Sequence, residues 1–164
     1  MPNANALVDS VSSLSSSLAE VREARRAGPA PSSVTVRFEG GQSGVLDLRQ
    51  PRSVVWAEVL HSMREANQPA YVEIDPVTNV ITELLCPVVV QVGEIRETKS
   101  GAEVDLIISH ARHYLQRARA NYRELLDALD SARRQKSTVI VTETDDHKII
   151  DVRPANVSGT SKRK

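Results

Sequence analysis

The first apolar pattern along the chain is a heptad spacing near its start. Its members follow one another at intervals of four, three, four and three, and they are Leu7, Val11, Leu14, Leu18 and Val21. This spacing places one apolar stripe along a helix, as in a coiled coil. Residues 28–33 then contain Gly28 and two prolines, which end helices and favour a linker. We therefore expect an N-terminal amphipathic helix over residues 1–27 and a short linker over 28–33.

After the linker, the pattern changes to that of strands, then to that of a helix, and then back to strands. Residues 34–48 contain two β-rich runs around a glycine-rich turn. Residues 53–67 have helical spacing, and residues 70–85 contain two more strand-like runs around the sequence DPVTN. This stretch predicts a strand-strand-helix-strand-strand unit over residues 34–87.

The same order returns from Val88 onward. It has a hairpin around ETKSG, a long helix over about 109–135 and a final hairpin around TDDH. The pattern predicts an α+β fold of two tandem strand-strand-helix-strand-strand repeats with antiparallel hairpins, the second over residues 88–154. Residues 155–164 are polar, small and basic at the end, which is typical of a disordered tail.

The expected long helix carries an apolar seam three heptads long. The seam residues are Ala111, Leu115, Ala118, Tyr122, Leu125 and Leu129. One interpretation is that the N-terminal helix docks along this seam, in its own chain or in a neighbour's, because the two stripes have the same period. The other is that the seam covers the sheets, as the apolar face of most amphipathic helices does.

The first turns of the same expected helix are basic and contain no acidic residue. Their basic side chains are His110, Arg112, His113, Arg117 and Arg119. Positive charge opposes the dipole at a helix start, so an anionic ligand there would offset a cost. The alternative is a solvated face that pairs with carboxylates elsewhere. His110 and His113 have a spacing that suits chelation, but two ligands do not define a metal site, and we expect neither a metal nor a cofactor.

Asp145, Asp146 and His147 form the densest polar cluster, between two runs of β-branched residues. In the repeat, they occupy the place of DPVTN, which reverses the chain. Asp is favoured in turns because its carboxylate bonds the backbone two residues later. A hard-cation loop would bring more oxygens than this cluster has. We therefore interpret residues 144–147 as a turn rather than a site.

Composition narrows the class of protein. Lys plus Arg and Asp plus Glu are 21 each, so no overall field draws the chain to nucleic acid or anionic lipid. The single cysteine, Cys86, excludes an intrachain disulfide, and its apolar neighbours predict a buried structural thiol. No apolar stretch approaches the roughly 20 residues of a membrane span, and no secretion signal is seen. We expect a cytoplasmic protein.

No catalytic, phosphate-loop, dinucleotide or zinc motif occurs, so we expect a protein without enzymatic activity. The leading hypothesis is an interaction or scaffold protein that self-associates, or docks to a larger assembly, through its N-terminal helix. The second is a regulatory module that binds a phosphate-bearing ligand or nucleic acid at the basic start of the long helix. The third is a small enzyme that uses His110, His113 and Asp145.

Overall fold

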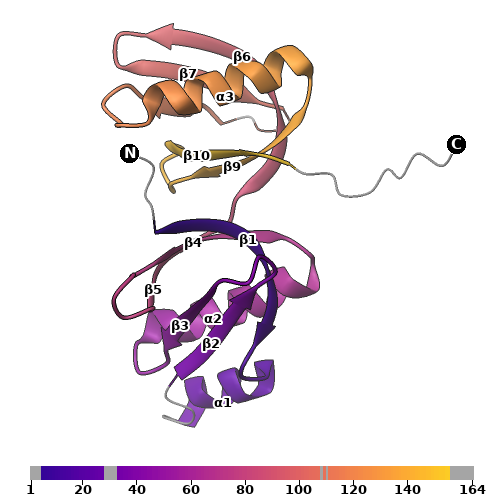
Figure 1. The fold of residues 1–164 in the computed structure, drawn as a ribbon, viewed down its shortest axis with the longest axis vertical. Coiled ribbons are helices and arrows are strands. Elements are labelled where there is room, and N and C mark those ends of the chain that lie inside the picture. Colours follow the sequence, from indigo (N-terminus) through magenta and orange to yellow (C-terminus); the bar gives the residue numbers. More distant parts are fainter. Residues whose placement is uncertain (1–4, 28–32, 108, 110, 156–164) are drawn as a thin grey trace, which may run out of the picture. The chain divides into compact units, whose positions relative to one another are not determined.

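The computed structural model describes residues 5–27, 33–107, 109 and 111–155. These residues form two five-stranded antiparallel sheets and three helices, which Figure 1 shows as a ribbon. The chain divides between Cys86 and Pro87 into two units, and each unit has its own sheet and its own apolar core. The mixed α+β class predicted from the sequence is confirmed.

The first unit is a sheet of strand order β3-β2-β1-β4-β5 with two helices. Its elements are β1 (Ala6–Leu14), α1 (Leu18–Ala27), β2 (Ser33–Phe38), β3 (Ser43–Asp47), α2 (Pro51–Glu65), β4 (Pro69–Ile74) and β5 (Ile81–Leu85). Val34, Val36 and Phe38 alternate along β2 and are buried, because successive side chains of a strand point to opposite faces. Helix α2 adds Ala57 and Leu60 to the same core.

The second unit is a sheet of strand order β10-β9-β6-β7-β8 with one described helix. Its elements are β6 (Val88–Thr98), β7 (Gly101–Leu106), β8 (His113–Gln116), α3 (Tyr122–Gln135), β9 (Thr138–Glu143) and β10 (Ile149–Pro154). Tyr122, Leu125 and Leu129 of α3 are buried in its core together with Leu115 of β8. Three residues of the predicted helical seam therefore pack against the sheet of their own unit, as one of the two interpretations expected.

Both sheets have the same connectivity. In each, the first strand is central, the second and third strands continue the sheet on one side, and a helix leads to the last two strands on the other side. In each, the two edge strands also meet at one end, through parallel bridges between Val45 and Val80 and between Tyr114 and Lys148. Strand β1 is thus the counterpart of β6, and the predicted first repeat, residues 34–87, leaves this central strand out.

The prediction of an N-terminal heptad helix is wrong. Residues 6–14 form β1, which pairs with both β2 and β4. Pairing on both edges satisfies the backbone polar groups of these residues, whereas a serine-rich helix alone in water is marginal. The helix begins only at Leu18, after a capping box in which the Glu20 carboxylate accepts from the Ser17 N–H at 2.9 Å and Ser17 Oγ accepts from the Glu20 N–H at 3.1 Å.

The prediction of one helix over 109–135 is also wrong in its first half. His113–Gln116 form β8, and residues 117–120 form a turn. The helix begins at Tyr122. Strand β8 satisfies its backbone by pairing with β7, with Leu115 opposite Ala102. Ala111 and Ala118 therefore do not share a helical face with Leu125 and the rest of the seam.

Three further predictions concern the linker, the tail and Cys86. The predicted linker and tail lie almost wholly outside the described residues. Cys86 was expected to be buried but is exposed. Its Sγ lies 3.9 Å from the Met63 Sδ. Although the residue is exposed, neighbouring protein atoms remove part of the water around the thiol, and this desolvation raises the pKa of Cys86 and disfavours the reactive thiolate.

Candidate functional site

The basic residues that the sequence groups at a helix start lie on three different elements. Arg112 is exposed in the loop before β8, with its Nε 4.0 Å from a Glu103 carboxylate oxygen. His113 is buried on β8, and Arg117 and Arg119 lie in the turn after it. His110 is outside the described residues. The described residues therefore do not form a basic helix start, and Arg117 lines a cavity of the second unit.

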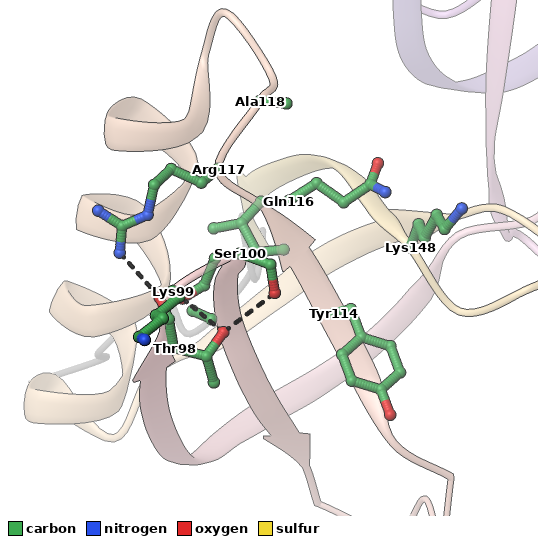
Figure 2. Close-up of a pocket in the computed structure, with 11 residues that line it drawn as sticks. Thr98, Lys99, Ser100, Tyr114, Gln116, Arg117, Ala118 and Lys148 are labelled. Atoms are coloured by element: carbon green, nitrogen blue, oxygen red, sulfur yellow. Dashed lines mark hydrogen bonds between the residues drawn. The ribbon is translucent and has the colours of Figure 1, made fainter.

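That cavity, which we call the basic pocket, has a volume of about 610 Å³ and is drawn in Figure 2. It lies between the turn from β6 to β7, strand β8 and the turn that follows β8. Its charged lining side chains are Lys99, Arg117 and Lys148, and its lining contains no carboxylate. The lining also includes Thr98, Ser100 and Tyr114, whose hydroxyl groups can form hydrogen bonds.

Arg117 is held in place by three contacts. Its guanidinium donates a hydrogen bond to the Thr98 carbonyl at 3.0 Å, which Figure 2 shows, and lies 5.3 Å from the centre of the Tyr122 ring. Its backbone N–H donates to the Ser100 carbonyl at 2.8 Å. A guanidinium held by one carbonyl and one aromatic ring keeps further N–H groups for a ligand.

Lys148 stands on the other side of the pocket from Arg117 in Figure 2. Its Nζ lies 2.9 Å from a carboxylate oxygen of Asp146, in the turn between β9 and β10. Lys148 is 42% exposed and Asp146 is 60% exposed, so water screens their attraction. The hydrogen bonds of Asp146 with Thr144 and Lys148 lower the pKa of its carboxyl.

Residues 144–147 do form a turn, as predicted. The Thr144 N–H donates to the Lys148 carbonyl at 2.9 Å, and the His147 N–H donates to the Thr144 carbonyl at the same distance. His147 has φ of 60°, a left-handed conformation that closes the turn. The His147 ring contacts Glu143, at the end of β9.

A second polar group, which we call the His-Glu-His cluster, consists of His113, Glu143 and His147. The Nδ1 atoms of His113 and His147 lie 2.5 Å and 3.0 Å from the two carboxylate oxygens of Glu143. The two rings meet edge to face, with their centres 5.1 Å apart. The His113 Nε2 contacts the Ser109 Oγ at 2.7 Å. Strand β8, the end of β9 and the β9–β10 turn thus bring three metal-ligating side chains together.

Sequence reasoning missed the His-Glu-His cluster, although it considered His113 and His147 separately. His113 and Glu143 are 30 positions apart and meet because the edge strand β8 forms a bridge from Tyr114 to Lys148, just after the β9–β10 turn. The i,i+4 spacing of Glu143 and His147 is the one short-range signal, and it is common on helices as well as in turns.

Comparison with protein-family models, with curated proteins and with solved structures gives no match to this chain. Within the described ranges, none of the helices has the length and apolar character needed to cross a membrane. Function has to be inferred from the two groups of side chains in the second unit.

Proposed function

We propose that the protein is a binding module without catalytic activity, whose second unit takes a small phosphate-bearing ligand in the basic pocket. The observation that carries this proposal is the lining itself. Three cationic side chains and no carboxylate surround one cavity, in a chain whose positive and negative residues balance. A local positive field in a neutral protein favours an anion at that place alone.

The chemistry of the lining suits phosphate oxygens. Arg117 offers a planar fork of N–H donors, and lysine ammonium groups complement it as point charges. The hydroxyls of Ser100 and Tyr114 can donate to oxygens that the cations do not reach. The volume of about 610 Å³ lies in the range of small-molecule sites. Tyr114 is 41% exposed and offers a ring face to a flat group on the ligand.

The ion pair of Lys148 with Asp146 does not prevent this role. Exposed pairs contribute about 0–1 kcal/mol, so exchanging the Asp146 carboxylate for a doubly charged phosphate group costs little. The exchange would leave Asp146 in water, where its charge is solvated. The contact of Arg117 with Thr98 remains, and it orients the guanidinium before the ligand arrives.

The test is a calorimetric titration of the full chain with inorganic pyrophosphate at low and high salt. We expect saturable binding that weakens as salt increases, because the contact is ionic. The double variant Lys99→Ala, Lys148→Ala should weaken binding about tenfold or more, since charged hydrogen bonds contribute about 1.5–3 kcal/mol.

Arg134→Ala is the matched control, because Arg134 is an exposed, ion-paired cation of the same unit on α3 and does not line the pocket. It should leave pyrophosphate affinity unchanged. Absence of saturable binding, or equal weakening by Arg134→Ala and the pocket variant, would contradict the proposal.

Leu7, Val11 and Leu14 belong to β1, so they do not form a helical stripe for assembly. Self-association, or docking to a larger assembly, stays a prediction. The cationic lining of the basic pocket favours binding of a small anionic ligand instead.

A further inference from the structure

The corner that holds the His-Glu-His cluster has a counterpart in the first unit. The Val45 N–H donates to the Asn79 carbonyl at 2.9 Å, just as the Tyr114 N–H donates to the His147 carbonyl at 2.9 Å. Asn79 and His147 both have left-handed backbones, with φ of 62° and 60°. The two turns are therefore equivalent in hydrogen bonding and backbone conformation, and His147 corresponds to Asn79.

The bridge between the edge strands extends this correspondence to the other two residues of the cluster. Val45 pairs with Val80 as Tyr114 pairs with Lys148, so the preceding residue His113 corresponds to Gly44. The N–H groups of Asp75 and Thr144 both donate across their turns, to the carbonyls of Val80 and Lys148. The residues before these two donors are Ile74 and Glu143, which makes Ile74 the counterpart of Glu143.

In the first unit this corner is filled by apolar side chains. A Cβ placed on Gly44 would lie 2.7 Å from Ile81 Cγ1 and 3.2 Å from Ile74 Cδ1, so the two isoleucines occupy the space. Ile81 is buried in the core of its unit. At this place the first unit has Gly44, Ile74 and Asn79, so the common connectivity closes with one polar side chain. Burying polar groups costs free energy unless each is paired, and the second unit places a buried histidine and a largely buried carboxylate where the first has glycine and isoleucine.

From this difference and the donor set we propose that His113, Glu143 and His147 form a binding site for a divalent transition metal ion of the zinc class. Two imidazoles and one carboxylate are a ligand set that suits zinc and its neighbours in the first transition row. Calcium and magnesium take mainly oxygen ligands, of which the cluster offers one carboxylate. With three protein ligands, the fourth position of a tetrahedral ion is left to water or to a ligand.

The distances fit an ion with small rearrangement. One ligand atom from each of the three residues lies within 4.8 Å of the others. Bonds of about 2.0–2.2 Å in a tetrahedron place ligand atoms roughly 3.3–3.5 Å apart. The imidazole to carboxylate distances of 2.5 Å and 3.0 Å then have to lengthen, by a rotation of the Glu143 side chain, which is at a strand end.

The surroundings supply both orientation and access. The His113 Nε2 contacts the Ser109 Oγ at 2.7 Å, so the proton of the neutral ring can reside on Nε2 and leave Nδ1 free to bind the ion. The His113 side chain is 3% exposed, Glu143 18% and His147 47%, so the site is anchored in the core and opens to solvent at His147. An ion can enter without unfolding of the sheet.

The test uses the full chain, stripped of metal by a chelator and titrated with Zn²⁺ by calorimetry, with Co²⁺ absorption as a report on tetrahedral coordination. We expect one ion per chain. His147→Asn removes one ligand and places at the turn the residue that the first unit has there. It should weaken Zn²⁺ binding by more than about 100-fold, since even an outer-shell partner can contribute 10–100-fold, and Glu143→Gln should also weaken it.

Circular dichroism of metal-free His147→Asn should match that of the parent chain, which separates loss of a ligand from loss of fold. His61→Asn is the matched histidine control, because His61 lies on α2 of the first unit, and it should bind Zn²⁺ as the parent does. Absence of stoichiometric Zn²⁺ binding would overturn the proposal. So would equal binding by His147→Asn, greater loss in His61→Asn, or binding of Ca²⁺ as tight as that of Zn²⁺.

Discussion

At the scale of single residues, Asp151 of β10 has a carboxyl whose protonation depends on burial. Its side chain is 18% exposed, and burial raises the pKa of its carboxyl, although the guanidinium of Arg153, whose Nε lies 3.1 Å away, acts against this rise. Glu124 adds a smaller contribution in the same direction as burial. The ionised carboxylate is therefore less favourable in the folded chain than in the unfolded one.

The pH dependence of stability follows from the direction of this shift. A carboxyl whose pKa is raised by folding binds its proton more tightly in the folded state, so its contribution to stability falls as pH rises through the folded pKa. Asp151→Asn removes this term. We expect the unfolding free energy of Asp151→Asn, relative to that of the parent, to be higher at pH 7 than at pH 4. Urea denaturation at the two pH values measures this difference.

Asp130→Asn is the control for the Asp151 prediction. The hydrogen bond from Arg133 lowers the pKa of Asp130 below its ordinary value of 3.8, so the sign is reversed, and this variant should lose stability relative to the parent as pH rises from about 2 to about 4. If Asp151→Asn shows the same sign as Asp130→Asn, the account of Asp151 is contradicted.

At the scale of elements, the beginning of the chain shows how one spacing supports two structures. Leu7, Val11 and Leu14 fit a heptad, but in the structure they belong to a strand with a register shift between Val11 and Ser13. The shift moves side chains between faces, so the strand does not show a simple alternation of apolar and polar residues. The capping box at Ser17 and Glu20 is the local signal that marks the true start of the helix.

Removal of residues 1–14 distinguishes the two structures for this segment. A detachable heptad helix would leave a folded body behind, whereas β1 is the central strand of the first sheet. We expect the shortened chain to lose the cooperative unfolding transition of the first unit. The fluorescence of Trp56, the single tryptophan of the chain, reports this transition. Removal of residues 156–164, in contrast, should leave that transition unchanged. A native Trp56 transition without residues 1–14 would contradict the assignment of β1.

At the scale of the whole molecule, the two units have cores that share no residue. Each core is formed by one sheet and its helix or helices. Each unit therefore pairs its own strands and buries its own apolar side chains. Domains with separate cores can unfold separately. The chain thus has the parts for two independent folding transitions.

A pair of matched core variants tests this independence. Leu60 of α2 and Leu129 of α3 are both fully buried, one in each unit. Truncation of a buried leucine to alanine costs about 2–5 kcal/mol. Leu60→Ala should lower by this amount the unfolding free energy that Trp56 fluorescence reports in urea. Leu129→Ala should leave that free energy unchanged and lower only the unfolding free energy of a transition seen by circular dichroism. Equal shifts of the Trp56 transition in both variants would show that the units unfold as one.

The sequence by itself determined the elements whose signals are local. The hairpins and helix expected over residues 34–85 occur as β2, β3, α2, β4 and β5, because alternation, Gly and Pro turns and helical spacing all act within about 15 residues. The turn at residues 144–147 is predicted from its place in the repeat and from its two Asp residues, because an Asp carboxylate can bond the backbone two residues later.

Only the tertiary structure decided the identity of β1 and β8 and the membership of the polar sites. Each of these strands exists because a partner strand from elsewhere in the chain satisfies its backbone, and this gain exceeds the weak helical preference of its own residues. The His-Glu-His cluster and the basic pocket join residues from strands and turns far apart in sequence, and no local spacing encodes such a meeting. Their geometry follows from the curvature of one sheet, which is a property of the whole unit.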